Sequence, residues 1–397
     1  MAYRALALKT LSDIRASYWF IPTCLAVLSV VLAQLTLWVD GNPDWIAAVL
    51  PDSMIHTQID GARATLSVIA QSVIGLAGVM FSITMVAVSF ASGNFGPRLI
   101  GNFMRDRGNQ WSLGILIATF VYALIMLRAV QSKFESEAAF VPQLSLVVAM
   151  GLTFLSVMVV IYFVHHVPET INVSNIAARL GRQLCDDLAA TARRVAEPAN
   201  PRVRNDLPRL TLEAVGYVQQ MDLDAMNGVA ETHGLMIDLL ILPGDFVHRD
   251  RFVAQVRGGA SDDTLDELRQ SFALGPSKTE DQNVLFLAEQ LVEMIARALS
   301  PGVNDPHTAI NCLNWLTAAL AEAGAAGNVF GVAPREYVSV RALTFRDLLD
   351  ATFGAAWHYV SDDPLARNAF DECLERLCHG ASPAVAGTVD EFRRDLS

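Results

Sequence analysis

The sequence predicts an α-helical membrane protein with four transmembrane helices followed by a cytoplasmic α+β domain. Hydrophobic residues make up 52% of the 397-residue chain and charged residues only 18%. The mean hydropathy of +0.35 also lies above that of ordinary soluble domains. Four long runs without charged side chains all lie in the first 168 residues, whereas the remainder mixes helical and strand-like apolar spacing. Membrane and non-membrane parts are therefore expected to follow one another along the chain.

Each of the four runs is long enough to cross a bilayer core of ~30 Å, which needs about 20 apolar residues. The second run lies in a stretch of 34 residues, between Arg63 and Arg98, that has no charged side chain. The first is too long for the apolar segment of a secretory signal, and no small-residue cleavage pattern follows it. Within a transmembrane domain of residues 1–168, we predict spans at about 16–39, 64–91, 108–127 and 141–164.

Charges in the connecting segments predict the orientation. The N-terminus carries Arg4, Lys9 and Arg15, and the first loop carries four aspartates, Asp40 among them. The second loop and the segment after the fourth span are rich in arginine. Because positive charge favours the cytoplasmic side, we expect a multi-pass protein of the bacterial inner membrane with both termini in the cytoplasm.

The pattern of the second half predicts a series of smaller parts. Pro243-Gly244-Asp245 is a turn signal after a strand-like run, and Asp305 followed by Pro306 is typical of a helix start. We predict an amphipathic helical extension at 169–195, a linker at 196–208, a small β-rich unit at 209–260 and a mainly helical unit at 261–397.

Small and polar residues recur on one face of the second predicted span. Lipid tails do not favour glutamine, serine or bare backbone, so this face is expected to meet protein or water. It either packs against another helix or lines a pore. The two can coexist if a second small face, Ala77, Thr84, Ala87 and Ala91, does the packing. The first face comprises Ser67, Gln71, Gly75, Gly78, Ser82, Ser89 and Ser92.

Three arginines, Arg98, Arg105 and Arg107, follow the inner end of the second span. In the simplest interpretation they determine the topology and face lipid headgroups. Alternatively, rings of them around a symmetry axis would attract anions at the inner mouth of a pore. No acidic or basic residue lies within the four runs, which disfavours a proton- or ion-coupled carrier.

Two further groups have a functional and a structural interpretation. Asn304, Asp305 and His307 could form a ligand loop, but helix capping accounts for Asp305. His165 and His166, at the inner end of the fourth span, could sense pH, although snorkelling to the interface is the simpler interpretation.

Signatures of other protein classes are missing from the sequence. There is no GxSxG, Walker A, HExxH or GxGxxG motif, and the five cysteines have no metal-ligand spacing. The net charge of −12 disfavours nucleic acid as a partner. We therefore expect no catalytic residues, no metal and no cofactor, and the protein is not expected to be an enzyme.

Several segments carry a more specific signal. They are FSITMVAVSFASGNFGPRLIGNF, QWSLGILIATFVYALIML, GYVQQMD, LPGDFV and ALSPGVNDPHTAINCL. In this order they resemble an uncharacterised bacterial family of predicted integral membrane proteins, the family of domain of unknown function 2254. The resemblance implies this domain order and supplies no activity. Where the family tends to have Arg-Thr and then Gln-Asp, this chain has Lys278-Thr279 and Gln282-Asn283, so a role that needs a guanidinium or carboxylate there is in question.

These observations predict a homo-oligomeric membrane channel or pore-like protein. The second span would line the axis, and the cytoplasmic domain would assemble and gate it. The alternative is a non-conducting sensor or scaffold, anchored in the membrane, whose cytoplasmic domain binds a small ligand or a protein. A membrane enzyme is a weaker third option. The expected partners are further copies of the chain and the lipid bilayer.

Overall fold

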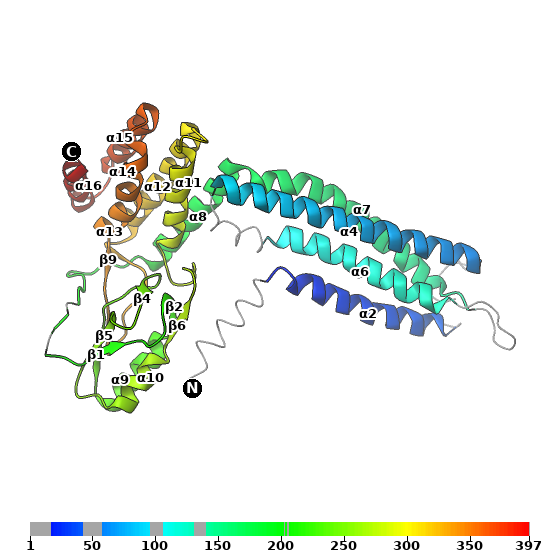
Figure 1. Cartoon of the computed structure of the whole chain (residues 1–397), viewed down its shortest axis with the longest axis horizontal. Coiled ribbons are helices and arrows are strands. Elements are labelled where there is room, and N and C mark those ends of the chain that lie inside the picture. The colour runs from blue at the N-terminus through cyan, green and yellow to red at the C-terminus, as the bar shows by residue number, and fades with distance from the viewer. Residues whose placement is uncertain are drawn as a thin grey trace. The chain divides into compact units, whose positions relative to one another are not determined.

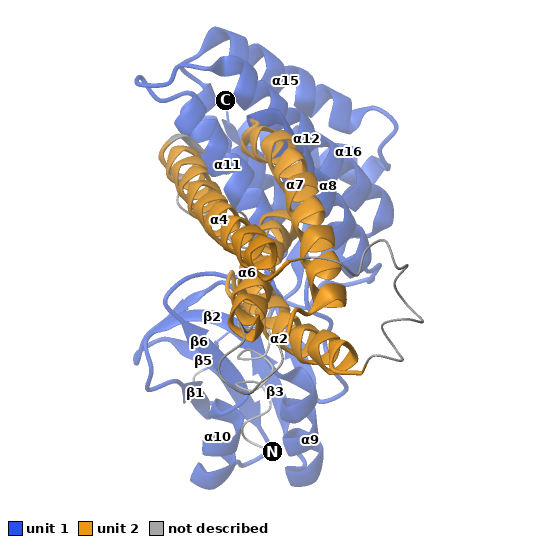
Figure 2. Ribbon diagram, turned by 90° about the vertical axis from the view of Figure 1, so that its right-hand side faces the viewer, with its two compact units in different colours: residues 1–13, 94–96, 173–397 blue, residues 14–93, 97–172 orange. Residues whose placement is uncertain are grey.

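The computed structural model describes residues 17–42, 58–95, 106–130, 140–201, 203–204 and 206–396. The chain divides into two compact units, coloured separately in Figure 2. The four-helix unit is built from residues 14–93 and 97–172, and the mixed unit mainly from residues 173–397.

The four-helix unit confirms the four predicted spans. Each of its long helices, labelled in Figure 1, is long and apolar enough to cross a membrane. Helices α4 and α7 extend beyond the predicted spans because backbone hydrogen bonding continues past the apolar run. The helices are α2 (Phe20–Asp40), α4 (Ile59–Phe95), α6 (Arg107–Ala129) and α7 (Gln143–Ile171).

One face of α4 packs into the unit. Leu66, Val73 and Met80 lie in one apolar cluster with Leu116 of α6 and Phe163 of α7. Large apolar side chains cover the outside of the unit; Val86 is 70% exposed and Phe154 is 67% exposed. Such an exterior suits hydrocarbon, because lipid tails are as apolar as these side chains.

Buried polar side chains hold these helices in register. The sequence interpretation assigns Asp40 to the first loop, but the structure places it, buried, as the last residue of α2. Its carboxylate accepts the backbone N–H groups of Leu144 (2.9 Å) and Ser145 (3.0 Å) and the Ser145 hydroxyl (2.6 Å). It thereby caps α7, whose first N–H groups have no partner within the helix. Tyr122 Oη lies 2.8 Å from Thr36 Oγ1 and ties α6 to α2 in the same way.

The mixed unit begins with the amphipathic helix α8 (Val173–Thr191), one residue after the end of α7. Its buried face packs on α11 (Phe286–Ala298) and α12 (Pro306–Ala326). Gly181 allows close approach to α12, since a Cβ there would lie 2.6 Å from Trp315. The described part of the predicted linker, 196–208, contains neither helix nor strand.

Three small sheets follow. The first has the order β1-β5-β3-β8, in which only the β3–β8 pair is parallel; the second has the order β4-β2-β6, and β7 pairs with β9. The strands are β1 (Arg209–Thr211), β2 (Gly216–Met221), β3 (Met236–Leu239), β4 (Phe246–Val247), β5 (Phe252–Arg257), β6 (Phe272–Gly275), β7 (Val329–Phe330), β8 (Val338–Val340) and β9 (Leu343–Thr344).

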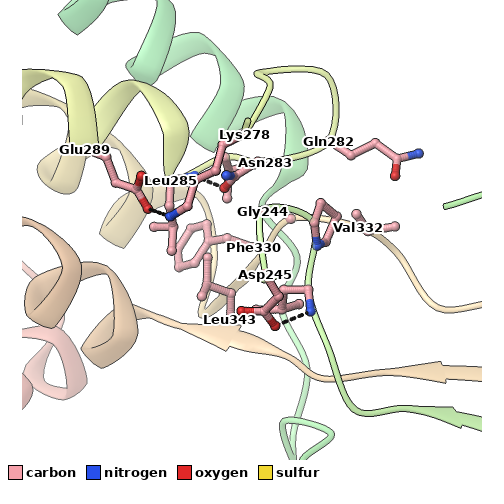
Figure 3. Close-up of a pocket in the computed structure, with 14 residues that line it drawn as sticks. Gly244, Asp245, Lys278, Gln282, Asn283, Leu285, Glu289, Phe330, Val332 and Leu343 are labelled. Carbon is pink, nitrogen blue, oxygen red and sulfur yellow. Dashed lines mark hydrogen bonds and ion pairs between the residues drawn. The ribbon is translucent and has the colours of Figure 1, made fainter. Parts of the chain in front are cut away.

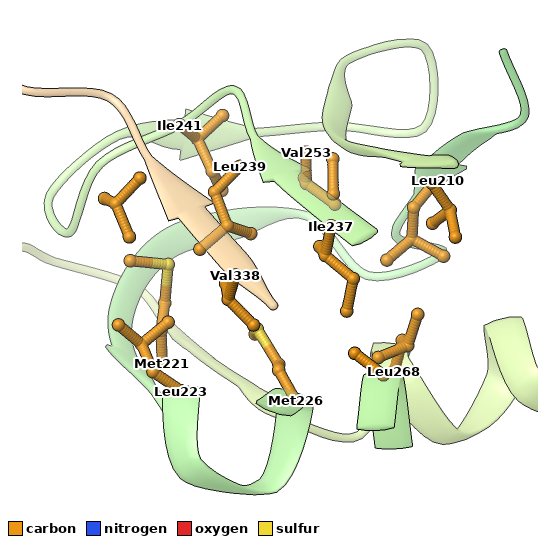
Figure 4. Packing of buried hydrophobic residues seen from close by; sticks show 14 of the residues in the cluster. Leu210, Met221, Leu223, Met226, Ile237, Leu239, Ile241, Val253, Leu268 and Val338 are labelled. Carbon is orange, nitrogen blue, oxygen red and sulfur yellow. The ribbon is translucent and has the colours of Figure 1, made fainter. Parts of the chain in front are cut away.

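Helices α9 (Leu223–His233) and α10 (Asp262–Arg269) supply apolar side chains to the core of the first sheet (Figure 4). Met226 and Leu268 pack there with residues of β3, β5 and β8. The sheets do not end at residue 260, the predicted boundary of the β-rich unit, because β6 and β8 come from later in the chain. Strands of three or four residues carry little periodic signal, so their long-range pairing is not visible in the sequence.

The C-terminal part is helical, as predicted. Asp305 caps α12 with Pro306 as its first residue, and Asp363 caps α15 in the same way. The remaining helices are α13 (Phe345–Leu349), a π-helical turn (Asp350–Gly354), α14 (Ala355–Val360), α15 (Pro364–Cys378) and α16 (Pro383–Leu396).

Candidate functional site

The small and polar face of the second predicted span, which we call the α4 stripe, lies on the outside of the four-helix unit. Ser67 is half-buried, while Gln71, Gly75, Gly78, Ser82 and Ser89 are exposed; the side chain of Ser92 lies outside the described residues. A Cβ on Gly75 or Gly78 would meet nothing within 4 Å. None of the described helices therefore covers this face.

The second small face points the other way. Ala77, Thr84 and Ala91 are buried and Ala87 is half-buried. Since α4 packs through this face, the stripe remains available for a partner or for water. The structure thus shows that α4 packs through the second face, and the role of the stripe stays a prediction.

The stripe satisfies only part of its own hydrogen-bonding capacity. Gln71 Nε2 donates to Ser67 Oγ (3.2 Å), and the Ser82 hydroxyl donates to the carbonyl of Gly78 (2.9 Å). A glutamine amide has two N–H donors and two carbonyl lone pairs, so Gln71 can bind further groups. In hydrocarbon that unused capacity is unfavourable.

The three arginines of the predicted inner mouth are only partly described. Arg98 and Arg105 lie outside the described residues. Arg107 is the exposed first residue of α6, directly after Asp106, whose carboxylate caps the helix by accepting the N–H of Asn109 (3.2 Å).

The two neighbouring histidines have different environments. His165 is exposed and its Nε2 lies 3.4 Å from Glu169. His166 is largely buried, with Nε2 3.1 Å from both carboxylate oxygens of Asp106. His166 therefore ties α7 to the start of α6, and the snorkelling interpretation describes only His165.

The predicted ligand loop is exposed at its tip. Asn304 has a left-handed backbone (φ 49°), and both Asn304 and His307 are exposed. The Asp305 carboxylate accepts the N–H (3.2 Å) and the hydroxyl (2.6 Å) of Thr308. The Thr308 hydroxyl is the main cause of the lowered pKa of Asp305. Capping accounts for Asp305, and the three side chains line no described pocket, so a ligand loop here stays a prediction.

A pocket of about 120 Å³ in the mixed unit was not predicted (Figure 3). It lies between the turn of LPGDFV and the loop that leads into α11, and β7 and β9 contribute Phe330 and Leu343 to its apolar wall. Lys278 and Glu289 form an ion pair at the pocket, and the side chain of each is 24% exposed. The pocket thus combines an apolar wall with a few charged side chains, Lys278, Glu289 and Asp245, as small-molecule sites commonly do.

Gly244 and Asn283 bring the two loops together. Gly244 has a left-handed φ of +93°, and a Cβ there would lie 2.2 Å from Asn283 Nδ2. Asn283 is only 8% exposed, and its Oδ1 accepts the N–H of Leu285 (3.1 Å). Gln282 points away from these side chains in Figure 3 and bonds to the backbone N–H (2.9 Å) and carbonyl (3.1 Å) of Met221.

One wall of the pocket is linked to helix α8. Arg193, just after α8, donates from its guanidinium to the carbonyls of Gly331 (2.8 Å) and Val332 (3.2 Å), both at the pocket. Burial lowers the pKa of Arg193. A movement of this wall would therefore be transmitted through Arg193 to the end of α8.

The sequence contained a signal for this pocket. LPGDFV and the segment with Lys278-Thr279 and Gln282-Asn283 both stood out, but the first was interpreted as a structural turn and the second only as a departure from a family pattern. They are more than 30 residues apart, and only the fold shows that they line one cavity.

The thiols add no reactive group to this site. Cys312 on α12 is fully buried, and burial raises the pKa of its thiol to about 12. Because the thiolate is the nucleophile, Cys312 is inert at neutral pH.

Comparison with known proteins identifies the family. The family described as "Predicted membrane protein (DUF2254)" matches residues 15–376. Uncharacterized protein Mb1321c of Mycobacterium bovis and uncharacterized protein Rv1290c of Mycobacterium tuberculosis are each 29% identical over 270 residues, covering 65% of this chain and 51% of the relative. The chain spans about half the length of these curated relatives, and no solved structure matches it. The chain belongs to the DUF2254 family of predicted membrane proteins.

Proposed function

We propose that the protein is a homo-oligomeric membrane channel in which α4 lines an axis shared by several copies. The observation that supports the proposal is the position of the α4 stripe, which lies on the lipid-accessible outside of the single chain. Exposed to acyl chains, Gln71 would keep hydrogen-bonding groups without partners, at a cost in free energy. Facing an axis, the same groups meet water or the same residue of a neighbouring copy.

The glycines of the stripe fit such an assembly. At Gly75 and Gly78 nothing stands beside the backbone, so α4 helices from different copies can approach closely. Ile74 and Phe81 lie on one side of the stripe and Val79 and Val86 on the other, and all four are exposed. These apolar flanks would form the contacts between copies. No charged side chain lies along the stripe. Conduction would therefore be controlled by a narrow apolar constriction that excludes water when it is closed.

Ion flux through liposomes that contain the full-length chain tests the proposal. Gly78→Leu places a bulky apolar side chain on the axis and is expected to abolish flux. Val157→Leu enlarges an exposed side chain of α7, outside the stripe and its flanks, and is expected to leave flux near that of the unmodified chain. Absence of flux from the unmodified chain, or equal loss in both variants, would contradict the channel.

The oligomeric state gives a second measurement. In a background without native cysteines, Gly75→Cys is expected to form disulfides between copies, because the stripes face one another across the axis. Phe154→Cys, on the exposed face of α7 and outside the stripe and its flanks, is expected to cross-link less. A particle that remains monomeric in lipid nanodiscs would end the proposal.

We also propose that the mixed unit binds a small polar ligand, as a sensor would. The pocket at Lys278 and Glu289 favours this second function. The charged pair can orient a polar ligand, and the apolar wall can bury part of it. Arg193 would transmit ligand binding from the pocket wall to α8. The sensor role does not require the protein to conduct ions, and a channel could also have this role.

A thermal-shift screen of small zwitterionic and anionic metabolites against the full chain tests the sensor. A ligand of the pocket is expected to raise the melting temperature of the unmodified chain and to lose most of this effect in Lys278→Gln. The control variant is Arg335→Gln, which breaks an ion pair with Asp224 outside the pocket. A screen in which every stabilising compound acts equally on Lys278→Gln would exclude the pocket as the binding site.

A further inference from the structure

A groove of about 390 Å³ opens on the surface of the four-helix unit, between α6 and α7. It lies on different helices from the α4 stripe. The sequence interpretation assigns Arg107, one residue of its lining, to lipid headgroups or to the mouth of a pore, but it predicts no groove. Its lining changes character along its length, from Arg107 and Trp111 in the first turns of α6 to Ile115, Met158 and Val159 deeper in the span.

The first turns of α6 give the groove a positive end. Arg107 is exposed, and the N-terminus of α6 adds a partial positive charge. Asp106, next to Arg107, would oppose an anion, but its side chain is only 9% exposed and both oxygens are held by His166. An anion at the mouth of the groove would therefore meet the guanidinium of Arg107 rather than the carboxylate of Asp106.

Tyr162 forms the wall of this end from the side of α7. Its ring stacks on His166, with the ring centroids 4.9 Å apart. The wall stands close to α6, since a Cβ on Gly108 would lie 2.6 Å from Tyr162 Oη. Tyr162 and Trp111 are both amphipathic aromatic residues, the kind that sits at headgroup depth in membranes.

The deeper part of the groove is apolar. Ile115 comes from α6, and Met158 and Val159 come from the facing stretch of α7. A second helix, about 10–12 Å across with its side chains, does not fit a space of this size. An acyl chain does, and in a membrane-spanning unit acyl chains are the surrounding solvent.

We propose that this groove binds one anionic phospholipid. The phosphate and the additional negative charge of the headgroup would contact Arg107, and one acyl chain would lie along Ile115, Met158 and Val159. A zwitterionic lipid can enter the same groove, but it offers no net charge to the guanidinium. The site would thus select its lipid by headgroup and hold it by the acyl chain.

Trp111 reports on the site directly. The full chain is reconstituted in phosphatidylcholine bilayers that contain an increasing fraction of phosphatidylglycerol with brominated acyl chains, which quench nearby tryptophan fluorescence. The Trp111 signal is the difference between the unmodified chain and Trp111→Phe. We expect half-maximal quenching at a lower fraction of brominated phosphatidylglycerol than of brominated phosphatidylcholine.

Two pairs of variants separate the headgroup contact from the acyl-chain contact. Arg107→Gln is expected to raise the half-maximal fraction about fivefold, whereas Arg128→Gln, at the other end of α6, leaves it unchanged. Val159→Phe narrows the groove and is expected to weaken quenching by both lipids. Val157→Phe, two residues away, exposed and outside the lining, is the matched control.

Equal quenching by the two lipids would overturn the proposal. It would also fail if Arg107→Gln weakened binding while Val159→Phe had no effect, because the arginine would then act as a surface charge without a groove. Neither result depends on whether the protein conducts ions.

Discussion

Both units of this protein have an apolar core, but they differ in their outside surface and in the contacts that fix their geometry. In the four-helix unit, Asp40, Tyr122 and Ser145 make hydrogen bonds between buried helices, while valine and phenylalanine cover the outside. In the mixed unit, the core of the first sheet is a continuous apolar cluster (Figure 4). The difference follows from the surroundings: apolar burial stabilises a unit in water but gains little between helices that already lie in lipid.

Specific geometry therefore has a different source in each unit. In the four-helix unit it depends on polar ties and on close approach, as at Gly114, where a Cβ would lie 2.7 Å from Leu25 Cδ1. In the mixed unit it depends on apolar packing and on turns whose backbone only glycine adopts readily, such as Gly244.

The largest expected effect is the loss of the buried cap of α7. Asp40→Ala removes three hydrogen bonds to one carboxylate and leaves the N–H groups of Leu144 and Ser145 without this partner. We expect the free energy of unfolding to fall by about 3 kcal/mol, measured by thermal or SDS-induced unfolding of the full chain in detergent. Asp60→Ala, an exposed aspartate in the first turn of α4, is the control and is expected to change it by less than about 0.5 kcal/mol. Equal losses of unfolding free energy in the two variants would show that the hydrogen bonds of Asp40 do not stabilise the four-helix unit.

The next effect tests the turn beside the pocket in the mixed unit. Gly244→Ala combines a left-handed backbone with a clash against Asn283, and we expect a loss of about 2–3 kcal/mol. Gly259→Ala shares the left-handed backbone (φ +66°) but meets nothing within 4 Å, so only the backbone cost of about 1 kcal/mol is expected. Calorimetry of the full chain measures both. If the two variants are equally stable, Asn283 moves aside freely and the pocket is not rigid.

The smallest effect concerns one hydroxyl. Tyr122→Phe removes a group that lies 2.8 Å from Thr36 Oγ1 and donates to the carbonyl of Ser145 (3.3 Å). We expect a loss of about 1 kcal/mol, because without the tyrosine hydroxyl Thr36 can still donate to the Ala33 carbonyl. Tyr162→Phe, at an exposed tyrosine of the same unit, is the control, with an expected change near zero. A stabilised Tyr122→Phe variant would show that the apolar environment favours phenylalanine over the hydrogen bonds.

Local features of the fold could be predicted from the sequence. The sequence predicted the four spans, the amphipathic helix α8 and the cap at Asp305. Each of these depends on a few neighbouring residues. The chemistry of the α4 stripe was equally visible, since helical periodicity places its members on one face.

The candidate pocket could not be predicted in the same way. Its two loops and its β-strand wall come from residues 242–245, 278–289 and 330–343, and no periodic pattern links them. The strand β8, which completes the first sheet from residues 338–340, was missed for the same reason.

The sequence alone determined that the chain has four helices long and apolar enough to cross a membrane, because apolar length is a local property and the bilayer has a fixed thickness. The tertiary structure alone decided which face of α4 is covered, that Asp40 caps a helix more than 100 residues away, and that two distant loops enclose one pocket. These depend on which surfaces meet after folding, and contacts between distant residues leave no spacing pattern in a single chain.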